Sequence, residues 1–446
     1  MGERALGSPR FESRLKLPST ARQNGATILR VLRVATHDVT VLDNGLCCER
    51  GGSLSCPERL SMITRRRFLR SLGVGAAAGA ALGSLPSTLD AFEPSRHAQA
   101  VGAKTALGAA RANAILLNSN ENAYGPLPKT VAVMQQALGW ANRYPDFDYD
   151  ALVWAIADLH KIKPQQVVTG CGSTEILRVS AAAFLGPGKK LVTGWPTFEA
   201  IAQYADAAGA EVVRIPLSSS YANDLNAMLS QSQSAPSLVH VCNPNNPTAS
   251  LTPRKDLDAF MSKLPASTYI LIDEAYHHFA VGAPEYSSFL DQPIDNPRVI
   301  VARTFSKVYG MAGMRLGYGV TSIETAERLR RFQTQDNVNM AAAQAGLAAL
   351  EDVDEMQTAV RRNAADRQEF FAQASRRSLK AIPSYTNFAM IDAGRPAHEV
   401  NSYFKQNGIL VGRRFPLMDN FVRVSFGKPN EMQQFWRVWD GMRKSS

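Results

Sequence analysis

One lysine of this chain is placed where it could do covalent chemistry. Lys307 lies in segment 304–315, which reads TFSKVYGMAGMR and follows an apolar run. Two hydroxyl residues, Thr304 and Ser306, precede the lysine, and Arg315 follows it. A lysine amine forms a Schiff base with an aldehyde, whereas hydroxyls and an arginine bind a phosphate. The segment therefore predicts a site for a small molecule that carries both groups.

A second candidate anion site lies where a predicted strand, 166–169, passes into a predicted helix, 173–184. The residues at this junction are Gly172, Ser173 and Thr174. Backbone N–H groups at a helix N-terminus bind anions, and the two hydroxyls add further donors. The same residues are also common helix caps, so the motif by itself favours neither interpretation.

Two polar side chains follow apolar strands further along the chain. Asn246 lies in a proline-flanked turn after strand 237–241, and Asp273 ends strand 268–272 with Tyr276 close behind. Ligands of open parallel sheets bind at the carboxyl ends of the strands. A carboxylate there can pair with a protonated ring nitrogen, and the amide and the phenol can bond a phenolate oxygen. With the lysine segment, these residues predict a pyridoxal 5′-phosphate (PLP) site.

The elements that must position these residues alternate along the chain. Short apolar strands alternate with helices between residues 149 and 302, which is typical of a mostly parallel sheet covered on both faces. A long helical region, 341–377, precedes shorter strands and helices that indicate a second, smaller α+β domain. The predicted organisation is an N-terminal arm (101–140), a large PLP-binding domain (141–325) and a small domain (326–446).

The order and spacing of the motifs resemble the PLP-dependent aminotransferases of fold type I, and most closely their histidinol-phosphate aminotransferase branch. The resemblance covers about residue 113 to the C-terminus, and it implies an α/β fold with a mostly parallel central sheet. It rests on Gly172-Ser173-Thr174, Pro196-Thr197-Phe198, Asn246-Pro247-Thr248, Asp273 with Tyr276, Ser306-Lys307, Arg315, Asn120-Glu121-Asn122, Tyr124-Gly125-Pro126 and Arg143-Tyr144-Pro145-Asp146.

The resemblance implies a role for each of these residues. Lys307 would bind the aldehyde and move a proton, Asp273 would pair with the pyridine nitrogen, and Tyr276 would complete the catalytic set. The cofactor would be held by Ser173, Thr174, Phe198, Asn246, Thr304, Ser306 and Arg315, and by Tyr144 from the other subunit of a homodimer. The substrate would be bound by Arg423, by Arg413 or Arg414, and by Asn120 and Tyr124. No metal site is predicted.

Two positions depart from the pattern of the family. Ala249 stands where the family usually has glycine, so a positive φ there would place an alanine in a strained conformation. Arg413 and Arg414 are adjacent, whereas the branch usually has a single arginine. The second departure leaves the donor open between histidinol phosphate and an aromatic amino acid.

The first hundred residues carry six of the ten net positive charges. Segment 64–70, TRRRFLR, resembles a twin-arginine export signal, and an uncharged stretch, 71–85, that is too short to span a membrane follows it. We therefore interpret residues 62–100 as a signal peptide and residues 1–61 as a disordered upstream extension. The prediction is a periplasmic or exported protein, or a cytoplasmic one if the signal is not used.

Three functions fit the predicted site. The first is an aminotransferase that moves an amino group from a small-molecule donor to a 2-oxo acid. The second is a PLP-dependent lyase, such as a phospho-amino-acid decarboxylase, and the third is a non-catalytic PLP-binding protein. The products separate the first two, because only the transaminase accumulates a keto acid. No nucleic-acid partner is predicted, since no basic run with interleaved aromatic residues follows Arg70.

Overall fold

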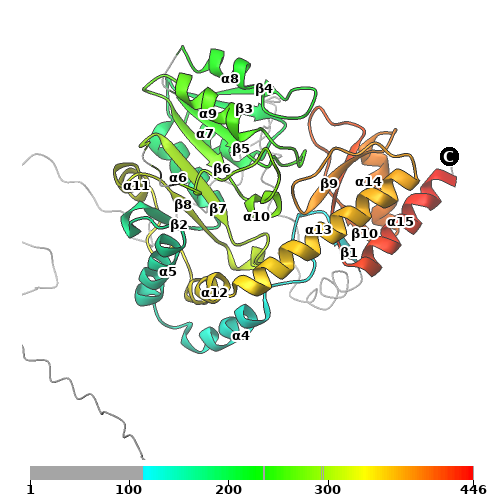
Figure 1. Cartoon of the computed structure of the whole chain (residues 1–446), viewed down its shortest axis with the longest axis horizontal. Helices are drawn as coiled ribbons and strands as arrows, with labels where there is room; N and C mark the ends of the chain where they lie inside the picture. Colours follow the sequence, from blue (N-terminus) through cyan, green and yellow to red (C-terminus); the bar gives the residue numbers. More distant parts are fainter. Residues whose placement is uncertain (1–113, 235–236, 293, 295, 445–446) are drawn as a thin grey trace, which may run out of the picture. The chain divides into compact units, whose positions relative to one another are not determined.

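The computed structural model describes residues 114–234, 237–292, 294 and 296–444. The predicted upstream extension (1–61), the predicted signal peptide (62–100) and the first residues of the predicted arm lie outside this part. Figure 1 shows a central sheet wrapped by helices, with a second group of strands and helices formed by the C-terminal segment. No helix in the described part is long and apolar enough to cross a membrane.

The central sheet has seven strands and is mostly parallel, as predicted. Only β8 runs antiparallel to both of its neighbours, β2 and β7. The strand order across the sheet is β2 (Val167–Cys171), β8 (Leu316–Val320), β7 (Val299–Thr304), β6 (Tyr269–Asp273), β5 (Ser237–Cys242), β3 (Lys190–Trp195) and β4 (Glu211–Pro216).

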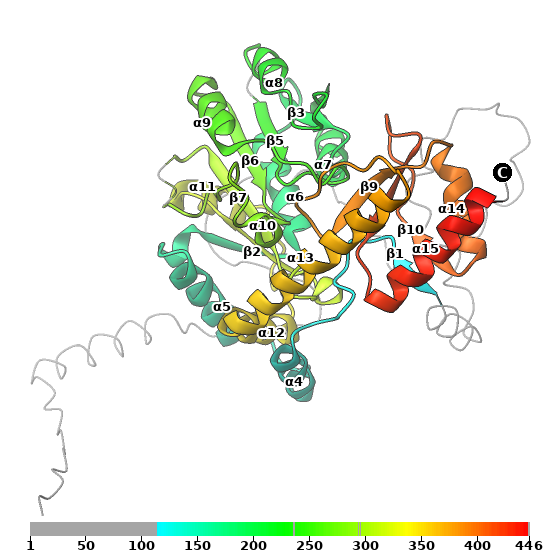
Figure 2. The ribbon, with the colours of Figure 1, turned by 45° about the vertical axis from the view of Figure 1, so that its right-hand side comes forward.

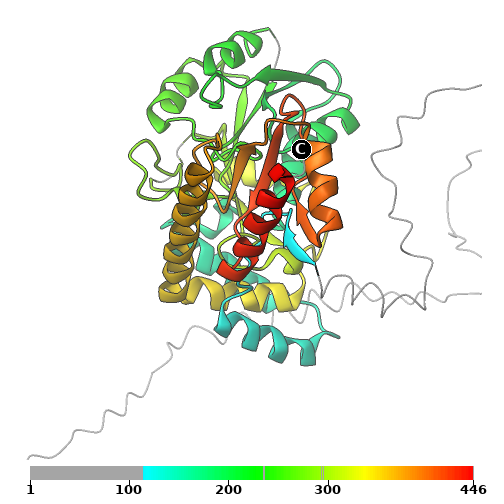
Figure 3. The ribbon, with the colours of Figure 1, turned by 90° about the vertical axis from the view of Figure 1, so that its right-hand side faces the viewer.

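Helices cover both faces of this sheet. One face packs against α6 (Ser173–Phe184), α7 (Ala200–Ala207) and α11 (Ile323–Arg330). The other packs against α5 (Asp146–Leu159), α8 (Leu225–Gln231), α9 (Arg254–Lys263) and α12 (Met340–Glu351). Figure 2 shows α12 beside α5, and Figure 3 shows it over α4 (Pro128–Ala137). The short helices are η2 (Leu138–Trp140), η3 (Pro164–Gln166), α10 (His277–Ala280) and η4 (Ala312–Met314).

The covered faces explain the continuous apolar runs in the sequence. Successive residues of a strand point to opposite faces. In β7, Val299 and Val301 enter the core on the α5 side, whereas Ile300 and Ala302 enter the core on the α6 side. Because both faces are buried, neither needs polar residues, and strands of this kind lack the alternation of a half-exposed sheet.

One buried histidine in the sheet predicts acid sensitivity. The His240 side chain on β5 is fully buried, and Nδ1 lies 3.0 Å from Thr193 Oγ1. Burial lowers the pKa of His240 to about 3. Since the unfolded chain binds this proton near pH 6.5 and the folded protein does not, stability falls as the pH drops from 6.5 towards 3. Between pH 7 and pH 5 this histidine alone costs about 2 kcal/mol of stability.

The measurement is urea unfolding of the wild type and of His240→Asn at pH 7 and pH 5. The variant keeps a polar atom near Thr193 but cannot take up the proton. Its free energy of unfolding should therefore fall less between the two pH values, by about 2 kcal/mol. An equal fall in both proteins would show that His240 does not titrate on unfolding.

The C-terminal segment forms a second core. Strands β9 (Phe388–Asp392) and β11 (Phe421–Ser425) pair antiparallel, and β1 (Ile115–Leu117) pairs in parallel with β10 (Ile409–Val411). Helices α13 (Val353–Arg376), α14 (Ala397–Gln406) and α15 (Pro429–Lys444) pack against these strands. The aromatic centre of this core comprises Phe370, Phe404, Phe435, Trp436 and Trp439. The start of the described chain is thus tied to the C-terminal strands.

The predicted helical region 341–377 is two helices rather than one. It divides at Asp352, whose backbone leaves the helical conformation with φ −90° and ψ 59°. Ala342 and Ala349 of α12 then pack in the core of the large sheet, although they follow residue 326, where the small domain was predicted to begin. Because of this break, α12 packs in the core of the large sheet, whereas the second half of α13 packs in the C-terminal core.

Candidate active site

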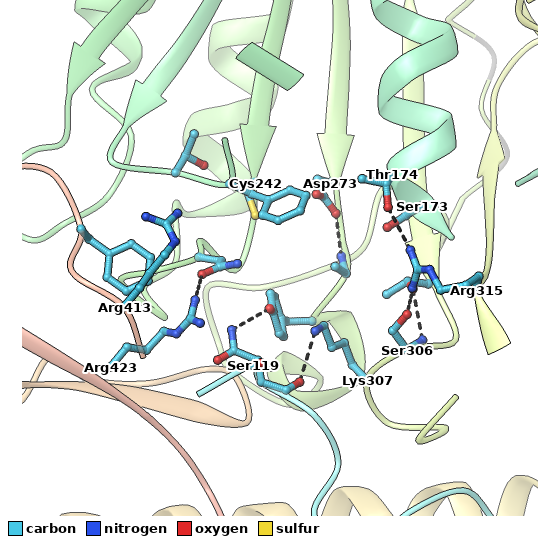
Figure 4. A pocket seen from close by; sticks show the side chains of 18 residues that line it. Ser119, Ser173, Thr174, Cys242, Asp273, Ser306, Lys307, Arg315, Arg413 and Arg423 are labelled. Carbon is cyan, nitrogen blue, oxygen red and sulfur yellow. Dashed lines mark hydrogen bonds between the residues drawn. The ribbon is translucent and has the colours of Figure 1, made fainter. Parts of the chain in front are cut away.

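A cavity of about 250 Å³ lies at the carboxyl ends of the parallel strands. Thirteen of the sixteen candidate site residues, with Arg413 and Arg414 both counted, line it: Lys307, Asp273, Tyr276, Ser173, Thr174, Phe198, Asn246, Thr304, Ser306, Arg315, Arg423, Arg413 and Asn120. Five more were not predicted as site residues, and these are Ser119, Thr197, Cys242, Ala275 and Phe415. Figure 4 shows Ser173, Thr174 and Arg315 at one end of the cavity and Arg413 and Arg423 at the other.

The first end of the cavity is built to hold an anion. Helix α6 begins at Ser173, so its N-terminal N–H groups face the same space as the Arg315 guanidinium. Arg315 Nη2 donates to Thr174 Oγ1 at 3.2 Å. A helix N-terminus and a guanidinium are both positive and repel each other unless an anion lies between them. This arrangement fits a phosphate group.

A glycine makes this approach possible. Gly172 has φ +74°, and a Cβ there would lie 2.4 Å from Arg315 Nη2. Glycine therefore serves two purposes, because it adopts the left-handed conformation without strain and leaves room for the guanidinium. On the other wall, Thr304 Oγ1 donates to Ser306 Oγ at 3.0 Å, which sets two hydroxyls side by side.

The centre of the cavity holds a buried carboxylate. Asp273 is 2% exposed, and Oδ1 accepts a hydrogen bond from the Ala275 N–H at 3.0 Å. Burial raises the pKa of Asp273 to about 6, because the charged form loses its hydration. A cation placed against this carboxylate would reverse that shift. The protonated ring nitrogen of PLP would be such a cation, so Asp273 fits the predicted cofactor.

Two side chains near Asp273 are oriented as donors. Asn246 Oδ1 accepts from Arg423 Nη1 at 2.7 Å, so its amide NH2 group points the opposite way. Tyr276 is 3% exposed, and its hydroxyl accepts from Asn120 Nδ2 at 3.0 Å. Burial raises the pKa of Tyr276, which keeps the hydroxyl protonated and able to donate. Both groups fit the phenolate oxygen of the predicted cofactor.

Lys307 lies between the two ends of the cavity. Its Nζ donates to the Asn120 carbonyl at 3.2 Å and lies 5.4 Å from the centre of the Tyr276 ring. Burial lowers the pKa of Lys307 to about 8, and the positive charge of Arg423 adds to this effect. An amine with this pKa is largely uncharged under mildly alkaline conditions, which is the form that attacks a carbonyl.

The lowered pKa of Lys307 can be tested in the cofactor-free protein. Acetylation by acetic anhydride consumes only the uncharged amine, so labelling of Lys307 should rise with a midpoint near pH 8. Lys263 on α9 is exposed and provides an internal reference for a lysine in contact with solvent. Mass spectrometry of the two peptides gives both curves. Arg423→Gln should raise the midpoint for Lys307, and equal midpoints for both lysines would contradict the prediction.

The opposite end of the cavity carries two arginines over one aromatic ring. The Arg423 and Arg413 guanidinium carbons lie 4.8 Å and 4.5 Å from the centre of the Phe415 ring. Burial lowers the pKa of Arg423 to about 10, which leaves the group charged at neutral pH. The adjacent Arg414 instead pairs with Asp419 at 2.5 Å and does not line the cavity.

Tyr124 and Tyr144 do not line the cavity. The Tyr124 hydroxyl lies 3.3 Å from Asp366 Oδ1 on α13, and its ring lies under Arg362. Tyr144 is 76% exposed. Asn120 lines the cavity because the arm around it is anchored by hydrogen bonds. In one of them, Asn122 Nδ2 donates to the Val308 carbonyl at 3.0 Å.

The expected strain at Ala249 is present. Ala249 is fully buried and has φ +61°, the left-handed conformation that glycine adopts more easily. Its N–H donates to the Asn245 carbonyl at 2.8 Å, and its carbonyl accepts from the Tyr385 N–H at 2.9 Å. These bonds hold the turn that carries Asn246, so the turn keeps its shape despite the alanine.

Comparisons with known proteins agree with this geometry. The family profile "Aminotransferase class I and II" matches residues 112–438. A histidinol-phosphate aminotransferase of Symbiobacterium thermophilum is 38% identical over 323 residues, covering 72% of this chain and 88% of that protein. An aromatic amino acid aminotransferase of Cutibacterium acnes is 33% identical over 299 residues, covering 67% of this chain and 84% of its own.

A solved structure shares the fold. The crystal structure of histidinol-phosphate aminotransferase from Sinorhizobium meliloti in complex with PLP superposes with a TM-score of 0.70 at 26% identity. The match covers 80% of this chain and 99% of that one. The similarity therefore extends over nearly the whole of the solved enzyme.

Proposed function

Because this chain belongs to the class I and II aminotransferases, we propose that its amino donor is histidinol phosphate or an aromatic amino acid and that its acceptor is a 2-oxo acid. The chain is a PLP-dependent aminotransferase. The observation that carries the proposal is the second cationic end of the cavity, formed by Arg423 and Arg413. It supports a donor that carries an anionic group on the side away from the cofactor phosphate.

The chain's own residues supply binding and proton transfer. Bound PLP supplies an aldehyde for the donor's amine and a ring that withdraws electrons. Lys307 would move a proton at the donor's Cα, since its lowered pKa lets it act as a base near neutral pH. Asp273 keeps a proton on the ring nitrogen, and Arg423 holds the donor's carboxylate or phosphate.

The test of the donor is a titration of the PLP-loaded protein with single donors. Phenylalanine, tyrosine, glutamate and histidinol phosphate are each added, and the absorbance of the bound cofactor and the keto acid released are measured. Conversion of the cofactor by an aromatic amino acid or by histidinol phosphate, reversed by 2-oxoglutarate, supports the proposal. Conversion by glutamate alone contradicts it. Release of CO2 without a keto acid would indicate the lyase reaction instead.

We also propose that the active unit is a homodimer. Leu138, Trp140, Tyr144 and Trp154 expose between 62% and 76% of their surface, an unusual amount for large apolar side chains on η2, the following loop and α5. A second copy that covers these residues would bury them and bring Tyr144 to its partner's phosphate site. Light scattering should give twice the chain mass for the wild type, and Trp140→Glu with Trp154→Glu should lower it. A monomeric, fully active wild type would contradict the proposal.

Export by the twin-arginine route remains a proposal, because residues 62–100 lie outside the described part. It rests on segment 64–70 and on the apolar stretch that follows. The test is fractionation of cells that produce the full chain and a variant with Arg65→Lys and Arg66→Lys. Periplasmic protein for the wild type and cytoplasmic protein for the variant are expected. Retention of both in the cytoplasm would contradict export.

A further inference from the structure

We propose that Glu199 sets the anion preference of the donor site, by occupying Arg413 so that the site favours a carboxylate over a phosphate. This inference rests on the proposed function, because it concerns the group that the donor presents to the second cationic end. It distinguishes the two donor classes that the comparisons leave open. An aromatic amino acid presents a carboxylate, whereas histidinol phosphate presents a phosphate.

Glu199 and Arg413 form an ion pair at the mouth of the cavity. Arg413 Nη2 lies 2.6 Å from Glu199 Oε2, and the two side chains are 55% and 27% exposed. Glu199 directly precedes α7 and follows the cavity residue Phe198, whereas Arg413 lies in the loop between β10 and β11. The pair therefore joins the segment around the large sheet to the segment around the C-terminal strands.

Arg423 is the second cation at this end, and no carboxylate pairs with it in the described part of the chain. Nη1 donates to Asn246 Oδ1 and Nη2 to the Asn118 carbonyl, both at 2.7 Å, and both acceptors are neutral. Nε is buried and has no hydrogen-bond partner among the residues described. A buried guanidinium with an unused donor is prepared to receive an anion.

The charges at this end match a carboxylate. Arg423 and Arg413 carry one positive charge each, and Glu199 carries one negative charge, so the net charge is +1. A carboxylate brings one negative charge, whereas a phosphate monoester above its second pKa of about 6 brings nearly two. A phosphate bound by both arginines would share the Arg413 guanidinium with Glu199, whose negative charge repels it. A carboxylate held by Arg423 alone leaves the pair between Glu199 and Arg413 intact.

The chain offers a matched control beside this pair. Arg414 follows Arg413 directly and pairs with Asp419 at 2.5 Å, with both side chains about two-thirds exposed. Neither Arg414 nor Asp419 lines the cavity. Glu199→Gln and Asp419→Asn thus each remove one acidic partner of an exposed arginine, and only the first acts on the cavity.

The experiment measures binding of two ligands that differ only in their anion. They are 3-phenylpropanoate and 2-phenylethyl phosphate, which lack an amine and so bind without reacting. Calorimetry on the PLP-loaded protein at pH 8 gives both dissociation constants for the wild type, Glu199→Gln and Asp419→Asn. An exposed ion pair is worth about 0.2–1 kcal/mol, so Glu199→Gln should tighten binding of the phosphate ligand by about 1.4-fold to fivefold relative to the carboxylate. Asp419→Asn should leave the ratio unchanged.

Two results would overturn the inference. One is an unchanged ratio in Glu199→Gln, whether neither ligand gains affinity or both gain it equally, because an equal gain would make Glu199 a general source of negative charge. The other is the same change of ratio in Asp419→Asn. The underlying function is checked separately in the same samples by adding phenylalanine and histidinol phosphate. If neither donor converts the cofactor in the wild type, the proposed donors fail, whatever the binding ratio shows.

Discussion

Replacement of Lys307 with alanine is expected to lower the turnover number by at least about 10³-fold. The substitution removes the amine that binds the cofactor aldehyde and also the base that moves the proton at the donor's Cα, and a positioned acid–base group alone contributes about 10²–10⁴-fold. The residues proposed to bind the phosphate, Ser173, Thr174 and Arg315, are unchanged in this variant. We therefore expect the variant to fold and to bind PLP without a covalent bond.

The measurement is donor-driven conversion of the cofactor absorbance, with circular dichroism as the check of folding. Lys307→Arg is the matched variant, because it keeps the positive charge and most of the volume but offers no amine that is uncharged near neutral pH. Both variants should lose activity to a similar extent. Borohydride reduction followed by mass spectrometry should attach the cofactor to Lys307 in the wild type. Substantial turnover in Lys307→Ala would refute the assignment of this lysine.

Replacement of Asp273 with asparagine is expected to produce the second large loss of activity. Removal of one partner of a buried charge pair costs about 2–5 kcal/mol, which corresponds to roughly thirtyfold to several thousandfold in rate. The ring nitrogen would lose the carboxylate that keeps it protonated, so the ring would withdraw electrons less well. The measurement is the rate of cofactor conversion by a saturating donor. An unchanged rate would place the partner of the ring nitrogen elsewhere.

The same substitution is expected to stabilise the cofactor-free protein. The folded-state pKa of Asp273, about 6, is higher than the ordinary value, so above pH 6 the folded protein carries a charge that burial disfavours. The buried charge of Asp273 therefore lowers the free energy of unfolding most above pH 6. This loss becomes smaller as the pH falls from 6 towards 4. At pH 8, Asp273→Asn should therefore raise the free energy of unfolding by about 2–3 kcal/mol.

These opposite effects separate a functional carboxylate from a structural one. A residue that only supported the fold would lose stability and activity together, whereas Asp273→Asn should gain stability and lose activity. PLP binding should reduce the difference in stability at pH 8, because the ring nitrogen supplies the missing cation only in the wild type. Urea unfolding with and without PLP gives the comparison. A destabilised cofactor-free variant would contradict the burial argument.

Most of the cavity could be predicted from the sequence because its residues follow strand ends. Asp273 and Asn246 come directly after apolar runs, and the carboxyl ends of parallel strands meet at one edge of the sheet. The same rule brought Lys307 beside them. Ala249 was also predictable, since the turn around Asn246 needs a left-handed residue whichever side chain occupies it.

Other contacts depend on distances across the fold and leave no local pattern. Arg413 and Arg414 are adjacent and chemically identical, yet one lines the cavity and the other pairs with Asp419. Phe415 lines the cavity from the loop between β10 and β11, and no strand end marks it in the sequence. The periodicity of the sequence cannot show which of these side chains points into the cavity, because that depends on which elements pack together.

The sequence by itself thus determined the fold class and the cofactor, and it predicted the lysine and its acidic counterpart. These follow from strand periodicity and from motifs whose residues lie within a few positions of each other. Only the tertiary structure decided that Arg413 is held by Glu199 and that the Tyr124 hydroxyl points to Asp366. It also decided that the helical region 341–377 divides at Asp352. Each of these features joins residues far apart in the chain or depends on packing between two cores, so the physical cause lies outside any local stretch.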